Sequence, residues 1–192
     1  MRYLLILPFC AWCLTTQANV QLPPIFTDHL ILQRDQMVPV WGTANAGETV
    51  VVEFAGQQHN VQADGSGKWV AKLNAMPANA EPRTLTVRGE NTVVINDVLV
   101  GEVWLASGQS NMGFPVSSAQ NATEALATAS DPLLRCFTVA RTTSAEPLRE
   151  AQGKWEISTA DTVKNFSAVA YFFARDLRRK QGLFHPGQVR GS

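Results

Sequence analysis

The spacing of apolar residues along this chain changes once, at Asn96-Asp97, from alternating to continuous. That change restricts the fold classes that the chain can adopt. Before this point, segments such as Lys68 to Leu73 and Arg83 to Arg88 alternate apolar and polar residues. Such alternation is typical of strands with one buried and one solvated face. After it, residues 98–100 and 103–106 form continuous apolar runs, as in strands buried on both faces of an α/β sheet. The sequence therefore predicts a mixed fold, with antiparallel strands first and a parallel sheet after them.

The first part reads as a small antiparallel β-sandwich over residues 19–97. Turn residues separate its apolar segments, and Asp64-Gly-Ser-Gly67 is a strong hairpin signal because glycine adopts the positive φ that tight turns require. Pro39 puts its strand at a sheet edge or a strand end. The predicted strands are two short segments around residues 30–33 and 38–42, followed by 49–54, 61–63, 68–73, 83–88 and 92–95.

The second part, residues 98–192, is predicted to contain both strands and helices. Residues 117–130 are rich in alanine and favour a helix, and Leu133 to Ala140 favours a buried strand in which Cys136 is an inert apolar residue. The strongest helix signal is Asn165 to Gly182, which ends in three basic residues that complement the helix dipole. Its predicted buried stripe is Phe166, Val169, Ala170, Phe173 and Leu177.

The first 18 residues have the pattern of a secretory signal peptide. Arg2 supplies the positive charge, Tyr3 to Leu14 is apolar, and Thr16-Gln17-Ala18 offers a small-residue cleavage site. A buried N-terminal strand is the alternative. We expect cleavage near Ala18 and export, after which Cys136 is the only cysteine and no internal disulfide can form.

Charge and motif content exclude several classes of function. The 16 basic and 16 acidic residues balance, so there is no basic footprint for nucleic acid. No apolar segment is long enough for a comfortable membrane span. The sequence carries no phosphate-binding loop and no paired histidines at metal-ligand spacing, and the mature chain has no paired cysteines, so we expect neither a metal nor another cofactor.

A chemically distinctive stretch follows the period change, where the apolar run from Gly101 ends in Ser107-Gly-Gln-Ser-Asn111. A serine that follows a sharp turn after a buried strand has an exposed hydroxyl and a free backbone N–H. Such a serine can attack an acyl carbon while its N–H stabilises the oxyanion. The spacing is equally compatible with a strand-to-loop turn without chemistry. Position 112 is methionine, so the stretch differs from the Gly-x-Ser-x-Gly elbow of α/β-hydrolases.

Four segments together resemble the sialate O-acetylesterase family. They are residues 26–34, 38–42, 65–69 and 98–112, and residues 166–177 are similar to the helix that follows in those proteins. The resemblance covers most of residues 20–182. Its densest motif, Gly-Glu-Val-Trp-Leu-x-Ser-Gly-Gln-Ser-Asn-Met, occupies residues 101–112 and is quite specific.

The resemblance implies an exported esterase that removes O-acetyl groups from sialic acid or related sugars. It further implies a β-rich domain followed by an SGNH-type α/β/α domain. Ser110 would be the nucleophile and its backbone N–H an oxyanion donor, with Gln109 and Asn111 as supporting polar groups. Ala106 and Gly113 differ from the cysteine and glutamate that often stand at those positions in the family.

The last ten residues, 183–192, depart from the family more seriously. The family continues with a second oxyanion donor and, later, an Asn and an Asp-x-x-His pair, none of which the tail resembles. A serine nucleophile needs a base, usually histidine. Of the three histidines, His29 and His59 fall in the predicted sandwich and His185 in the tail. We therefore expect an incomplete form, shortened by truncation, frameshift or a fragmentary gene model, with weak activity or none.

A second function from a different class is also compatible with the sequence. The β-sandwich could act as a non-catalytic exported module that binds carbohydrate or serves as a scaffold. Exposed aromatic side chains on one face would favour it, and the only tryptophans in that part are Trp41 and Trp69. The alternation around residue 69 predicts that Trp69 is buried.

Overall fold

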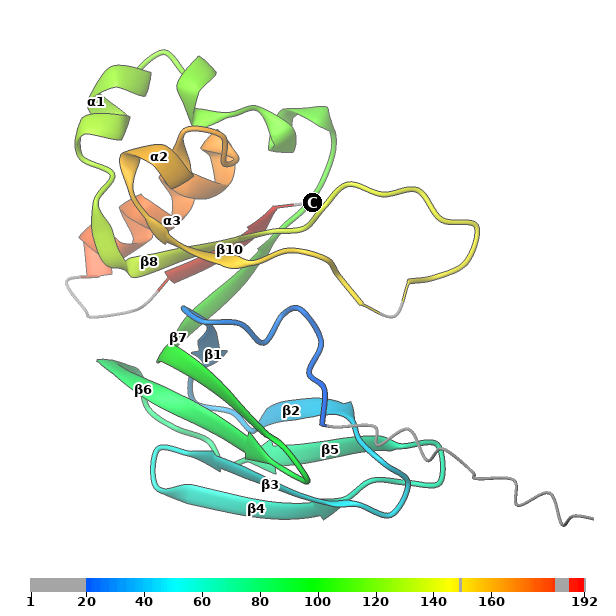
Figure 1. Cartoon of the computed structure of the whole chain (residues 1–192). Helices are drawn as coiled ribbons and strands as arrows, with labels where there is room; N and C mark the ends of the chain where they lie inside the picture. The colour runs from blue at the N-terminus through cyan, green and yellow to red at the C-terminus, as the bar shows by residue number, and fades with distance from the viewer. Residues whose placement is uncertain (1–19, 149, 182–186, 192) are drawn as a thin grey trace, which may run out of the picture.

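The computed structural model describes residues 20–148, 150–181 and 187–191, and the predicted signal segment lies outside them. The strands are β1 (Ile31–Gln33), β2 (Val38–Thr43), β3 (Thr49–Phe54), β4 (Gln57–Gln62), β5 (Lys68–Leu73), β6 (Asn79–Arg88), β7 (Thr92–Ala106), β8 (Asp131–Thr138), β9 (Trp155–Ser158) and β10 (Gly187–Gly191). The helices are the 3-10 turns η1 (Ser110–Gly113) and η2 (Val116–Ser118) and the α-helices α1 (Ala122–Ala127), α2 (Ala160–Val163) and α3 (Ala168–Gln181). The mixed α/β class is confirmed (Figure 1).

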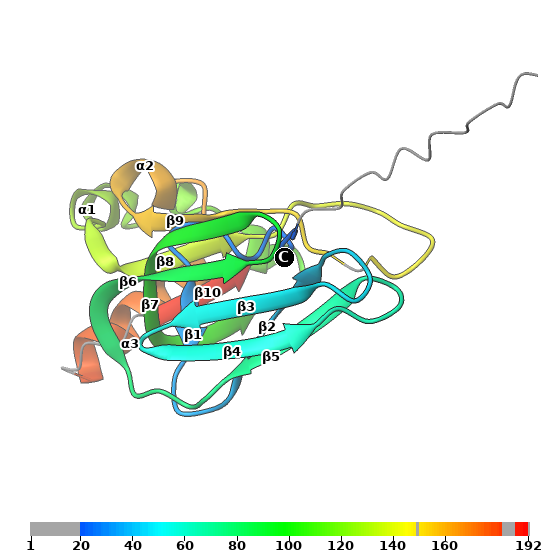
Figure 2. The same cartoon turned by 60° about the horizontal axis from the view of Figure 1, so that its bottom comes forward.

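The N-terminal strands enclose an apolar core between two sheets. β2 and β5 form an antiparallel pair, while β4, β3, β6 and β7 lie in that order in a larger sheet, as Figure 2 shows from another side. β3 and β5 coincide with the predicted segments, and the inward residues of β5, Trp69, Ala71 and Leu73, are all buried. Their burial follows from the period-two alternation read in the sequence.

One long strand, β7, joins the two parts of the molecule. The sequence predicted separate strands on either side of Asn96-Asp97, but β7 runs unbroken through both residues. Asp97 adopts a φ of +55° without ending the strand. β6 pairs antiparallel with residues 92–100 of β7, whereas β1 and β10 pair parallel with residues 99–106. β7 therefore belongs to both the antiparallel and the parallel regions of a single mixed sheet.

The parallel region carries its helices on one face. β10 lies between β7 and β8, and β9 pairs antiparallel with β8 at the edge. Leu134 and Cys136 of β8 face the core formed with the helices, while Phe137 packs into the N-terminal core against Trp155. The expected α/β/α layering is thus not seen among the described residues, because N-terminal β-structure covers the second face (Figure 1).

The stripe predicted for helix α3 is buried only in part. Phe166 and Ala170 are buried as predicted, whereas Val169 and Phe173 are exposed, with Phe173 edge-to-face against Trp104 at 5.3 Å. Tyr171 and Ala174 are buried instead, so the inner face is rotated from the predicted one. The helix predicted for residues 117–130 is shorter, with only Ala122–Ala127 in α-helix, because η2 and turns take up the rest.

The prediction for Cys136 is confirmed. Its side chain is buried, and burial raises the pKa of the thiol to about 12. A neutral thiol without access to solvent is a poor nucleophile. Among the described residues, no helix is long and apolar enough to cross a membrane.

A buried ion pair fixes β8 against β7. Arg135 is 2% exposed, and its guanidinium donates two hydrogen bonds to the Asp97 carboxylate, at 2.6 and 3.0 Å. His29 Nδ1 lies 2.6 Å from the same carboxylate. Partial burial alone would raise the pKa of Asp97, but the hydrogen bonds from Arg135 and His29 outweigh burial and hold it below its usual value.

We predict that Asp97→Asn destabilises the fold by about 3 kcal/mol at pH 7, because it leaves a buried guanidinium without its counter-charge. Asparagine also tolerates positive φ, so the backbone is preserved. Since the folded pKa of Asp97 is lowered, the wild-type advantage is complete above about pH 5 and declines as pH falls through that lowered value. Urea unfolding at several pH values measures the difference.

The matched control is Asp161→Asn, which removes a carboxylate that is 93% exposed and paired with Lys164 at 3.3 Å. An exposed pair of this kind contributes about 0.5 kcal/mol or less. Equal stabilities of Asp97→Asn and wild type at pH 7 would show that the ion pair does not hold the two regions together.

Candidate functional site

Ser110 lies directly beyond the carboxyl end of β7, at the first position of η1. Three residues, Ser107 to Gln109, connect the strand to this turn, and Gly108 takes a φ of 158° that residues with side chains rarely adopt. Ser110 is exposed, and its hydroxyl has no hydrogen-bond partner among the described residues. As the first residue of a helical turn it has no intrahelical partner for its N–H. The geometry is that expected for an accessible nucleophile.

Gln109 and Asn111 flank Ser110 in the same turn, and both side chains are exposed. Their carbonyl oxygens accept hydrogen bonds from the backbone N–H groups of Met112 and Phe114, at 2.9 and 3.2 Å. These bonds close the turn and leave both side-chain amides available to a ligand. The turn itself is only four residues long, so its contribution comes from individual N–H groups and not from a helix dipole.

The turn is held by the segment that leads into α3. The N–H of Ala168 donates to the Phe114 carbonyl at 2.8 Å, and the N–H of Val116 donates to the Phe166 carbonyl at 3.0 Å. The hydroxyl of Ser167 lies 3.5 Å from the sulfur of Met112, which packs against the helical core. The residues that follow Ser110 are therefore held against the start of α3, whereas the Ser110 side chain itself stays exposed.

Neither described histidine lies near Ser110. His29 contacts Asp97, which precedes the end of β7 by nine residues, or roughly 30 Å of extended strand. His59 lies on β4, at the far edge of the N-terminal sheet, and bonds to Gln57. His185 is outside the described residues. The described residues therefore place no histidine beside Ser110.

Arg141 is a neighbour of the nucleophile turn that sequence reasoning missed. Its guanidinium lies so close to Gly113 that any side chain at position 113 would collide with it. Arg141 begins the connection between β8 and β9, 28 residues away in sequence, so no local pattern could reveal the contact. The one available signal was glycine at a position where the family often has glutamate.

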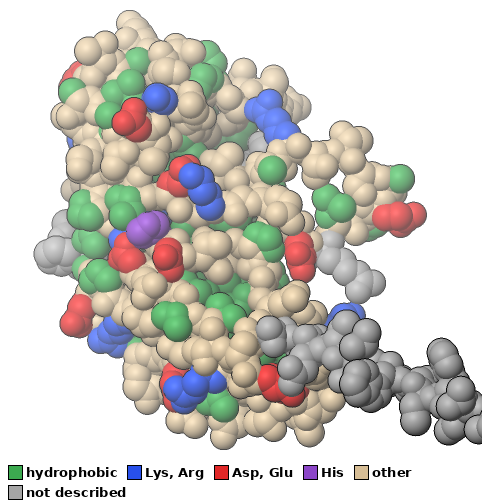
Figure 3. Space-filling view, in the orientation of Figure 1, with side chains coloured by type: hydrophobic (Ala, Val, Ile, Leu, Met, Phe, Trp, Pro, Cys, Tyr) green, Lys and Arg blue, Asp and Glu red, His purple; other side chains and the backbone are tan. Residues whose placement is uncertain are grey.

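The described residues contain no cluster of metal-ligating side chains. No group of three or more His, Cys, Asp or Glu side chains within residues 20–148, 150–181 and 187–191 could hold a metal ion. On the face drawn in Figure 3, charged side chains of both signs are interspersed and form no single-sign patch.

Comparison with known proteins identifies relatives. Sialate O-acetylesterase of Rattus norvegicus is 32% identical over 170 residues, which cover 78% of this chain and 31% of that protein. The Homo sapiens sialate O-acetylesterase is 26% identical over 194 residues, or 90% of this chain and 37% of that protein. This chain is distantly homologous to the sialate O-acetylesterases. No family model matches it.

A solved structure extends the relationship to the fold. The crystal structure of a carbohydrate acetylesterase from Xanthomonas citri superposes with a TM-score of 0.85 at 38% identity, covering 89% of this chain and 39% of that one. The arrangement of β-structure, nucleophile turn and helices is therefore that of part of a carbohydrate acetylesterase. The chain spans about a third of the length of the curated relatives that it matches.

We predict that Gly113, next to the Ser110 turn, and Gly153, in the β8–β9 connection, differ in their tolerance of alanine. At Gly113 a methyl group meets only the flexible end of Arg141, so Gly113→Ala should cost about 0.5 kcal/mol or less. At Gly153 a methyl group would lie 2.5 Å from the Thr138 carbonyl oxygen, held in β8, and 2.6 Å from the buried Phe137 ring, so Gly153→Ala should cost about 2 kcal/mol. Chemical unfolding of both variants provides the comparison, and equal costs would contradict this account of the β8–β9 connection.

Proposed function

We propose that this chain carries the nucleophile of a carbohydrate O-acetylesterase, with Ser110 attacking the acetyl carbonyl of an O-acetylated sugar such as an acetylated sialic acid. The observation that carries the proposal is the exposed serine just beyond the carboxyl end of β7, in a chain homologous to acetylesterases over most of its length. The proposal includes export after cleavage near Ala18 and descent from a β-sandwich followed by an SGNH-type domain.

The chemistry divides into two parts. The Ser110 oxygen forms the bond to the acetyl carbon and must lose its proton to a base, while backbone N–H groups stabilise the oxyanion that develops. Ser110 N–H and the amides of Gln109 and Asn111 are the groups that the turn offers for stabilisation. The described residues offer no histidine for the proton transfer, so hydrolysis by the 192-residue polypeptide alone would be residual.

We predict that this polypeptide hydrolyses p-nitrophenyl acetate at least about 10³-fold more slowly than a complete esterase of the same class, because a serine hydroxyl without a positioned base is a weak nucleophile. Ser110→Ala should reduce the remaining rate to that of buffer. Initial rates at several enzyme concentrations measure both effects.

The control is Ser118→Ala, which removes an exposed hydroxyl from η2 and should leave the rate unchanged. Residual hydrolysis that survives Ser110→Ala would exclude Ser110 as the nucleophile. Turnover at the rate of a complete enzyme, abolished by Ser110→Ala, would instead show that a base is present and would refute the claim of incompleteness.

A further inference from the structure

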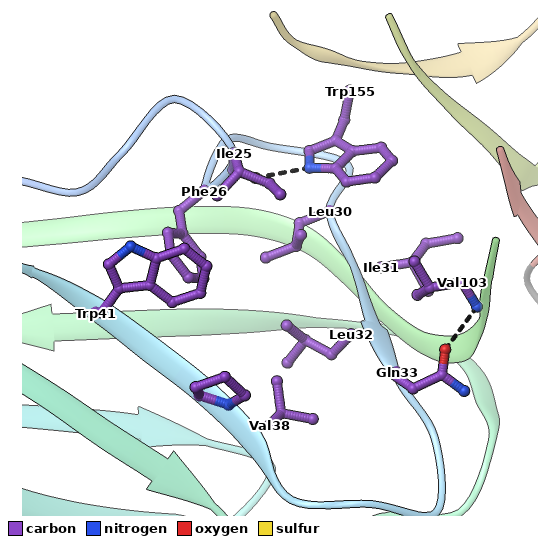
Figure 4. Close-up of a pocket in the computed structure, with 11 residues that line it drawn as sticks. Ile25, Phe26, Leu30, Ile31, Leu32, Gln33, Val38, Trp41, Val103 and Trp155 are labelled. Carbon is purple, nitrogen blue, oxygen red and sulfur yellow. Dashed lines mark hydrogen bonds between the residues drawn. The ribbon is translucent and has the colours of Figure 1, made fainter. Parts of the chain in front are cut away.

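Trp41 of β2 is a partly exposed aromatic side chain on the outer face of the β2–β5 sheet. It is 38% exposed and pairs in register with Val70 of β5, which is 53% exposed. Phe26 contacts the indole edge-to-face at 4.8 Å between ring centroids and fixes its orientation (Figure 4). The indole is therefore both partly exposed and fixed in orientation. Such an aromatic ring is a preorganised contact surface for a ligand.

Two hollows adjoin this indole. The first, of about 160 Å³, is lined almost wholly by apolar side chains, including Phe26, Leu32 and Val38, as Figure 4 shows. The second is a cleft of about 410 Å³ between the N-terminal segment, β2, β5 and the β8–β9 connection. Only the second is within the range of small-ligand sites.

The larger cleft combines an exposed tryptophan with polar groups of several kinds. Lys68, Thr43 and Glu150 line it together with Trp41, and all of these are exposed. In register, Trp41 and Thr43 of β2 stand opposite Val70 and Lys68 of β5, so these side chains share the outer face of the sheet.

We propose that this cleft binds one pyranose unit of a glycan, with the Trp41 indole stacked against the apolar face of the sugar. The ring hydroxyls would then meet the side chains of Lys68 and Glu150. This site is separate from the Ser110 turn, and its occupancy requires no catalysis. It goes beyond the proposed hydrolysis because it concerns recognition of the carbohydrate chain.

The lining selects a sugar over other small ligands. A purely apolar ligand would leave the Lys68 and Glu150 side chains without compensation for lost water. A simple anion would suit Lys68 but would be repelled by Glu150. A pyranose presents C–H groups on one face and hydroxyls at its rim, which matches an aromatic wall with a polar margin. The first hollow lacks such a margin and is too small.

Xylotriose and 3′-sialyllactose titrated into the full chain by isothermal titration calorimetry test the proposal. We expect saturable millimolar binding of at least one of them. Trp41→Ala should weaken it by about tenfold or more, and Trp41→Phe by about threefold, because the smaller ring retains part of the stacking surface. Lys68→Met, which keeps the apolar stem and removes the ammonium group, should weaken binding by about fivefold.

Met37→Ala is the matched control, since Met37 is 64% exposed just before β2 and does not line the cleft. Its affinity should equal that of wild type, and so should that of Ser110→Ala, which separates this test from the test of the nucleophile. If Trp41→Ala fails to fold, Trp41→Phe and Lys68→Met decide the outcome. Absence of saturable binding by wild type up to about 20 mM, or unchanged affinity in these variants, would overturn the proposal.

Discussion

The buried guanidinium of Arg135 is the constraint on which the arrangement of this molecule depends. A charge with 2% exposure is tolerated only where a counter-charge and hydrogen bonds compensate for lost water, and Asp97 supplies both. Asp97 lies within β7 and Arg135 within β8, so their pairing fixes one strand against the other. His29, which precedes β1, adds the N-terminal segment to the same carboxylate. β7, β8 and the segment before β1 therefore meet at this ion pair. It lies at Asn96-Asp97, where the spacing of apolar residues in the sequence changes.

Sequence reasoning identified most strands because burial on one face leaves a local, period-two record, as in β3 and β5. It failed where the determinant was not local. Asn96-Asp97 resembles a turn, yet β7 continues through it because Asp97 at positive φ is held by Arg135, 38 residues away. The inner face of α3 was only partly predicted, because Tyr171 and Ala174 are buried where the sequence favoured Val169 and Phe173. Neither the ion pair nor this choice of face leaves a clear periodic signal in the sequence.

The turn at Ser110 was predictable from sequence, whereas its surroundings were not. Glycine and the end of an apolar run mark the turn at Ser110, and the motif around it is dense. The anchoring of residues 114–117 to residues 164–168 consists of backbone hydrogen bonds, which any side chains can make. The Trp41 cleft likewise combines residues from four separate segments. Sites assembled in this way follow from the fold and cannot be read from any single stretch.

The connection between β8 and β9 links the two sites physically. At its beginning, Arg141 lies against Gly113, within three residues of Ser110. Towards its end, Glu150 lines the Trp41 cleft. A ligand that contacts Glu150 therefore acts on the same segment that carries Arg141, so ordering of this connection by a glycan would restrict the position of the guanidinium beside the nucleophile turn. Recognition of the carbohydrate chain and access to Ser110 would then depend on one segment, whose ends are fixed by the antiparallel pair β8 and β9.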